Sequence, residues 1–157
     1  FTDKTLGNFC HMDLIIDLFP NAKFVHCTRD LKENIISIFK QNFDQLPWSY
    51  TLESILKYVD HYLELMNFLN KKYKKYIFEI NHKRLVLNKE EESKKLFNFL
   101  NLEWTNKIFN FSSNKTFTNT ASKNQIKDGI NSKYLDKYFH YYNLFDKFKH
   151  KYDWLNY

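Results

Sequence analysis

The chain has 157 residues, of which 43% are hydrophobic and 27% charged, and its formal net charge is +6. This length and composition predict one globular domain and exclude a disordered chain. The positive charge fits an anionic ligand, and it fits nucleic acid or a membrane surface equally well. No apolar run approaches the length of a membrane span, and no signal peptide is visible.

The two cysteines, Cys10 and Cys27, provide neither a disulfide framework nor the spacing of metal ligands. We interpret them as reduced, largely buried thiols of a cytoplasmic protein, and we expect no metal site.

The first predicted elements are an extended segment over 1–8 and a helix that Asn8 would cap. A β-prone run over 24–27 follows the turn signal Pro20-Asn21 and predicts a buried strand. This strand is expected to stop at Thr28-Arg29, immediately before a new helix.

Asp30 has the chemistry of an N-cap for that helix, and Glu33 completes a capping box. Backbone N–H groups at the start of such a helix can bind an anion, and the planar guanidinium of Arg29 can hold a phosphate through two hydrogen bonds. Ser37 lies two turns beyond Asp30 on the polar side of the helix. Arg29 and Ser37 are therefore candidates for a two-point phosphate clamp. The alternative is a surface arginine and an exposed serine in an ordinary α/β unit.

Further along, apolar residues at helical spacing predict a long helix that begins at Ser49 or Thr51. A second buried strand is expected over 76–80, and a helix between two buried strands implies parallel pairing. The basic run 71–75 suits a solvated helix end or, less readily, a nucleic-acid patch. After a loop over 81–86, Asn88 and Glu91 form a second capping box. A long loop over 107–120 then precedes a final helix from Ser132.

Several of these segments resemble one family. The run 18–23, then Arg29-Asp30 and Ser37, is similar to the core of sulfotransferases that use 3′-phosphoadenosine 5′-phosphosulfate (PAPS). The likeness is strongest to tyrosylprotein sulfotransferases and to bacterial relatives that carry tetratricopeptide repeats. It implies that Arg29 and Ser37 bind the 3′-phosphate of PAPS.

Other motifs follow in the family's order. The segment 3–8 resembles Asp-Lys-x-Pro-x-Asn, which implies that Lys4 stabilises the sulfuryl group during transfer. The segment 120–126 resembles Thr-Ala-Ser-x-x-Gln-Val, in which Ser122 would approach the reacting sulfate. Lys137-Tyr138 stands where the family has Lys-Trp, so Lys137 would contact a cofactor phosphate. In the segment 81–86, His82 occupies the place of a cofactor-contacting tyrosine.

The resemblance implies an α/β, P-loop-NTPase-like sulfotransferase fold with a parallel sheet flanked by helices. Gly7 and Gly129 are the only glycines, so the family's glycine-containing phosphosulfate loop cannot form here. We therefore expect residues 1–157 to be the carboxy-terminal portion of one longer domain, without its amino-terminal strand, its phosphosulfate loop and its glutamate base. This portion would hold the 3′-phosphate half of the site and be inactive alone.

The expected reaction moves a sulfuryl group from PAPS, without a metal, to a hydroxyl of a protein tyrosine, a sugar or a small molecule. The resemblance implies no nucleic-acid or membrane partner, and it leaves open tetratricopeptide repeats upstream in the same chain. The alternative function is a non-catalytic, lysine-rich α/β module that binds nucleic acid or a partner protein.

Overall fold

The computed structural model describes residues 1–41, 43–110 and 130–157. Its sheet has two strands, β1 (Phe24–Thr28) and β2 (Ile77–Asn81), which pair in parallel with Phe24 opposite Ile77 and Thr28 opposite Asn81. The predicted parallel pairing is confirmed. Because both strands run in one direction, their carboxyl ends lie at the same edge of the sheet.

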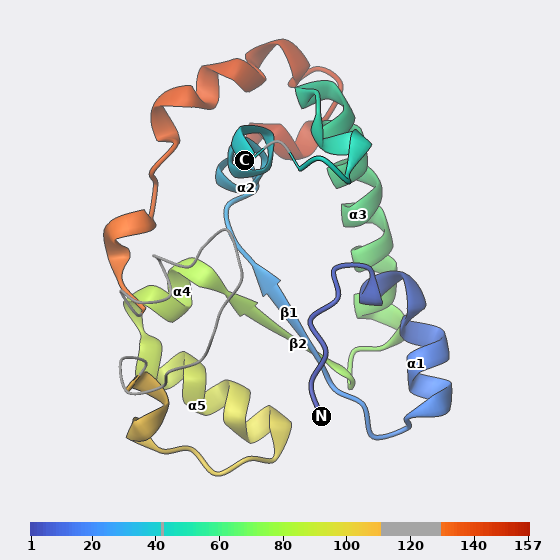
Figure 1. The fold of residues 1–157 in the computed structure, drawn as a ribbon, viewed down its shortest axis with the longest axis vertical. Coiled ribbons are helices and arrows are strands. Elements are labelled where there is room, and N and C mark those ends of the chain that lie inside the picture. The colour runs from blue at the N-terminus through green and yellow to red at the C-terminus, as the bar shows by residue number, and fades with distance from the viewer. Residues whose placement is uncertain (42, 111–129) are drawn as a thin grey trace.

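Helices flank this sheet on both sides. Figure 1 shows α1 and α3 on one side and α4 and α5 on the other, while the segment 130–157 passes over α2 and the adjacent end of α3. The α-helices are α1 (Met12–Leu18), α2 (Leu31–Gln41), α3 (Leu52–Lys72), α4 (His82–Leu87) and α5 (Lys89–Leu100). The 3₁₀-helices are η1 (Asn8–His11), η2 (Pro47–Ser49), η3 (Asn106–Phe109), η5 (Ser132–Tyr134), η6 (Phe139–Phe148) and η7 (Asp153–Asn156). The predicted α/β class, with a parallel sheet between helices, is confirmed.

Two hydrophobic cores hold these elements together, and α3 belongs to both. The first core joins α2 and α3 to the segment 130–157; its buried members are Ile35, Ile36, Ile55, Leu56, Val59, Phe145, Tyr152 and Leu155. The second core joins α1 and α3 to the sheet; its buried members are Met12, Met66 and Leu69, against which Phe24 and Ile77 pack. With 21 residues, α3 is roughly 30 Å long. It therefore fixes the segment 130–157 relative to the sheet.

Two helix starts agree with the sequence. Asp30 accepts a hydrogen bond from the Glu33 backbone N–H at 2.9 Å, which confirms it as the cap of α2. Thr51 accepts from the Ser54 backbone N–H at 3.1 Å and caps α3. Each side-chain oxygen pairs with a backbone donor that the helix itself cannot satisfy.

Other local predictions are wrong. The expected loop over 81–86 is largely helical, because Asn81 accepts from the Arg84 backbone N–H at 3.1 Å and starts α4. Asn88 makes no side-chain capping bond to α5. The final helix from Ser132 is interrupted after Tyr134, because Leu135 is extended and Asp136 has a left-handed φ of 52°, and neither conformation continues a right-handed helix.

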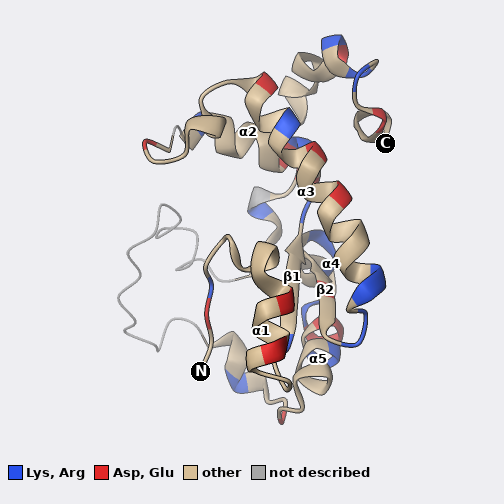
Figure 2. Ribbon diagram, turned by 90° about the vertical axis from the view of Figure 1, so that its right-hand side faces the viewer, with Lys and Arg blue, Asp and Glu red and all other residues tan. Residues whose placement is uncertain are grey.

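The cysteines also differ from expectation, since both Cys10 and Cys27 are exposed. Burial alternates along β1, and Cys27 lies on its exposed side together with Val25. None of the helices in the described ranges is long and apolar enough to cross a membrane. Figure 2 shows Lys and Arg positions interspersed with Asp and Glu positions along the described part of the ribbon.

The first core yields a stability prediction. Phe145 is fully buried between α2 and α3, so Phe145→Ala should lower the free energy of unfolding by about 3–5 kcal/mol. Phe139, at 68% exposure, is the matched control, and Phe139→Ala should change it by less than about 0.5 kcal/mol. Urea unfolding followed by circular dichroism measures both values. Similar small losses in the two variants would contradict this description of the core.

Candidate functional site

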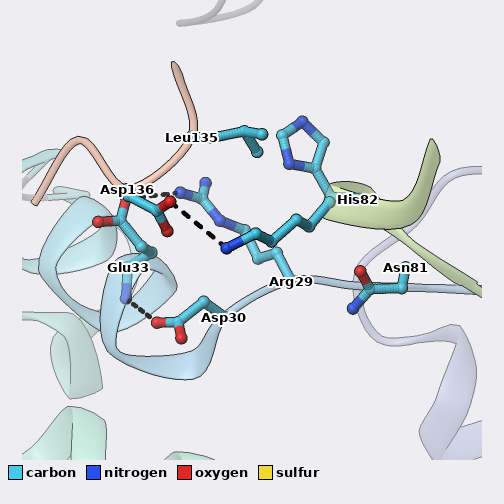
Figure 3. Close-up of a pocket in the computed structure, with 8 residues that line it drawn as sticks. Arg29, Asp30, Glu33, Asn81, His82, Leu135 and Asp136 are labelled. Atoms are coloured by element: carbon cyan, nitrogen blue, oxygen red, sulfur yellow. Dashed lines mark hydrogen bonds and ion pairs between the residues drawn. The ribbon is translucent and has the colours of Figure 1, made fainter. Parts of the chain in front are cut away.

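A pocket of about 220 Å³ lies at the carboxyl edge of the two strands. Three separate parts of the chain form its walls: the β1–α2 junction, the β2–α4 junction and the segment 130–157 (Figure 3). Its lining residues are Arg29, Asp30, Glu33, Asn81, His82, Lys83, Leu135 and Asp136. Ligands of open α/β sheets bind outside the carboxyl ends of strands, so this is where a site is expected.

Arg29 follows β1 directly and is the main cation of the pocket. One terminal nitrogen of its guanidinium lies 3.4 Å from Oε2 of Glu33, and its side chain remains 34% exposed. Among the described residues, Glu33 is the one hydrogen-bond partner of the Arg29 guanidinium. A guanidinium carries five N–H donors in a planar fork. Arg29 therefore keeps donors for a ligand while Glu33 holds its charge in place (Figure 3).

The amino end of α2 also holds the segment 130–157. Oε1 of Glu33 accepts the Tyr138 backbone N–H at 2.6 Å, and Asp30 accepts the Tyr142 hydroxyl at 2.7 Å. Burial, and then the hydrogen bond to Asp30, raise the pKa of Tyr142, which keeps its phenol protonated as a donor. The Asp30 and Glu33 carboxylates thus attach the segment 130–157 to the start of α2.

The opposite wall comes from the end of β2 and the first residues of α4. Nζ of Lys83 lies 3.4 Å from Oδ2 of Asp136, and both side chains are more than half exposed, so this pair adds little stability. Burial lowers the pKa of His82, and the positive charge of Arg29 lowers it further. His82 is therefore neutral near pH 7, and an anion beside it would favour its protonated form.

This arrangement can bind an oxyanion. The start of α2 carries partial positive charge, and Arg29 offers bidentate hydrogen-bond geometry next to it. The three carboxylates that line the pocket already have partners: Asp30 and Glu33 in the network described above, and Asp136 with Lys83. An anion that uses the remaining donors of Arg29 has no need to displace Glu33. No cluster of metal-ligating side chains occurs in the described ranges.

Of the residues singled out from the sequence, Arg29 and His82 line this one pocket. Lys137 adjoins the pocket residue Asp136, and its Nζ lies 5.4 Å from the centre of the Tyr138 ring. Ser37 is half-buried on α2, one turn beyond Glu33, and is not among the lining residues.

The two residues assigned to the sulfuryl group are not placed in this pocket. Lys4 is exposed in the amino-terminal segment and does not line it. Ser122 lies outside the described residues.

Two contacts of the site were not predicted from the sequence. Glu33 was expected only to complete a capping box, although its position four residues after Arg29 is the spacing of a helical ion pair. Asp136 and Lys83 are 53 residues apart in the chain. Nothing in the local pattern of either residue indicates their contact.

Comparison with known proteins adds two matches. The model of a sulfotransferase family matches residues 1–106, which include Lys4, Arg29, Ser37 and His82. The chain is also similar to an uncharacterized protein of Aquifex aeolicus (strain VF5), with 29% identity over 143 residues. That match covers 88% of this chain and 19% of the relative, so the chain spans about a fifth of the relative's length.

The environment of His82 can be tested by titration. We expect NMR to give His82 a pKa below the ordinary value for histidine, and Arg29→Gln to raise it part of the way back, because burial remains. His26 is an internal control: burial lowers its pKa and the charge of Glu79 opposes that shift, so Arg29→Gln should leave it unchanged. A His82 pKa that does not respond to Arg29→Gln would show that the two side chains do not face one another.

Proposed function

Because the chain belongs to the sulfotransferase family, we propose that its pocket binds the 3′-phosphate of PAPS. In the whole protein this site would serve transfer of a sulfuryl group from PAPS to an acceptor hydroxyl. The observation that carries the proposal is the partly exposed guanidinium of Arg29, which stands beside His82 where two parallel strands end.

The size of the pocket supports a phosphate rather than a whole nucleotide. Pockets that enclose drug-sized ligands have volumes of roughly 300–1,000 Å³. At about 220 Å³, this pocket is smaller than that range. It therefore suits one group of a larger molecule. The remainder of the cofactor would bind residues outside this pocket.

Each of these side chains has one proposed role. Arg29 holds the 3′-phosphate in the pocket, His82 faces it, and Lys137 adds positive charge from the segment 130–157. Ser37 does not line the pocket, so it would reach a phosphate oxygen only from outside the pocket walls. Lys4 and Ser122 serve the sulfuryl group. PAPS supplies the activated sulfuryl group, and its transfer leaves 3′,5′-ADP (PAP). By analogy with phosphoryl transfer the transition state is loose, so positioned cations provide most of the acceleration.

We also propose the finer classification and the wider organisation. The motifs favour a tyrosylprotein sulfotransferase-like enzyme of the bacterial group associated with tetratricopeptide repeats, acting in the cytoplasm. Residues 1–157 would form one portion of a longer catalytic domain, with the phosphosulfate loop and the general base supplied by other residues. A relative about five times as long as the matched region is compatible with additional domains.

The clamp predicts a loss of PAP affinity on substitution of Arg29. In the full-length protein, Arg29→Ala should weaken PAP binding by about 2 kcal/mol or more, because a charge-assisted pair is lost. Arg29→Lys should recover only part of this loss, since an ammonium lacks the planar fork. Arg84, which pairs with Glu79 and Glu92 and does not line the pocket, is the matched control. Calorimetry that gives equal PAP affinities for Arg29→Ala and Arg84→Ala would refute the proposed clamp.

Lys4 should behave differently from Arg29, because its proposed partner is charge that develops during transfer. We expect Lys4→Ala to lower the turnover number about a hundredfold and to leave PAP affinity nearly intact. Lys71→Ala, an exposed lysine on the last turn of α3, is the control. An equal loss of PAP affinity and turnover would make Lys4 a ground-state ligand instead.

A further inference from the structure

Glu33 connects the pocket to a part of the chain more than one hundred residues away. We propose that Glu33 is a positioning residue that couples anion binding at Arg29 to docking of the stretch 135–138. This inference rests on the proposed function, because it takes the anion to be the 3′-phosphate of PAPS.

The burial and the partners of Glu33 carry the first step. Its side chain is 3% exposed, and a carboxylate in such a place requires partners for its charge. Oε2 pairs with Arg29 at 3.4 Å, and Oε1 accepts the Tyr138 backbone N–H at 2.6 Å. The two oxygens therefore hold two different walls of the pocket.

A purely local role for this carboxylate does not account for these contacts. In a capping box, the side chain of Glu33 would bond to the backbone N–H of the cap residue, Asp30. Here the side chain of Asp30 caps α2, while the carboxylate oxygens of Glu33 bind Arg29 and Tyr138. The start of the helix therefore does not depend on the carboxylate of Glu33.

None of the four side chains of the stretch 135–138 is fully buried, and of these four Tyr138 packs against the first core. Phe145 and Leu155 are fully buried in the first core and fix the later part of the segment. The stretch 135–138 supplies Leu135 and Asp136 to the pocket wall, and Asp136 has a left-handed backbone. A non-glycine residue persists in that conformation only where surrounding contacts determine it. The bond from Tyr138 to Glu33 is such a contact.

Coupling follows from this geometry. The side chains of Leu135 and Asp136 offer a phosphate no hydrogen-bond donor, so the coupling runs through Arg29 and Glu33. A phosphate that fixes the guanidinium also fixes the carboxylate that accepts the Tyr138 backbone N–H, and it thereby favours docking. By linkage, docking would raise the affinity for phosphate by the same factor. Lys137, between Asp136 and Tyr138, would be brought to the pocket by the same step.

The test measures both sides of this coupling in the full-length protein. Calorimetry gives the Kd for PAP, and hydrogen exchange followed by mass spectrometry reports on a peptide that contains the Tyr138 amide. In the wild type, PAP should slow exchange of this amide. Glu33→Ala removes the acceptor of that N–H, so exchange should rise and the Kd should increase, each by about tenfold.

Glu33→Gln separates docking from charge. Its amide oxygen can still accept the Tyr138 N–H, so exchange should stay at the wild-type rate. Loss of the negative charge beside Arg29 should leave PAP binding no weaker than in the wild type. Glu91→Ala removes an exposed carboxylate that pairs with Lys95 on α5, and should change neither the exchange rate nor the Kd.

Tyr142→Phe removes the bond to Asp30 without altering a pocket residue, and should raise the exchange rate and the Kd about threefold. This variant, checked by circular dichroism, keeps the test decisive if Glu33→Ala does not fold.

Two results would overturn the inference while PAP still binds to the wild type. One is exchange at Tyr138 that PAP does not slow. The other is a Kd that Glu33→Ala and Tyr142→Phe leave unchanged. A wild-type protein that binds no PAP would instead refute the proposed function, and the coupling with it.

Discussion

The parallel pairing of β1 and β2 is the constraint on which the site depends. Its register sets Thr28 opposite Asn81, so the next residues, Arg29 and His82, leave the sheet at the same edge. A shift in this register would separate Arg29 from the opposite wall. The helices preserve the register from both sides: the second core packs Phe24 and Ile77 against α1 and α3, and Phe99 of α5 stacks on Phe78, with ring centres 5.3 Å apart.

A buried carboxylate extends this arrangement to a third part of the chain. Glu33 balances the charge of Arg29 and at the same time accepts the Tyr138 backbone N–H. A buried carboxylate such as Glu33 is costly to desolvate, so its ion pair and hydrogen bond add little net stability. Loss of either partner would leave the carboxylate unsatisfied, and its contacts therefore fix the geometry of the pocket walls. The chain has 24 basic residues and Arg29 is one of only two arginines among them. A planar fork at this place is chemically specific, because a lysine could not bind Glu33 and a phosphate in the same plane.

The sequence predicted the features that depend on neighbouring residues. Asp30 and Thr51 cap helices as expected, both strands form, and Arg29 stands between a strand and a helix start. The features that it did not predict depend on distant residues or on the backbone. The bond between Glu33 and Tyr138 spans 105 residues, and the expected helix from Ser132 stops at Tyr134, before the extended Leu135 and the left-handed Asp136. Cys27 was interpreted as a largely buried thiol, whereas the face of β1 that carries Cys27 is exposed.

The central claim is that this edge of the sheet binds the 3′-phosphate of PAPS. A crystal structure of the full-length protein with PAP tests it most directly. We expect 3′-phosphate oxygens within hydrogen-bond distance of the Arg29 guanidinium, with Glu33 still bonded to the Tyr138 backbone N–H. A 3′-phosphate bound elsewhere, with Arg29 contacting Glu33 alone, would contradict it.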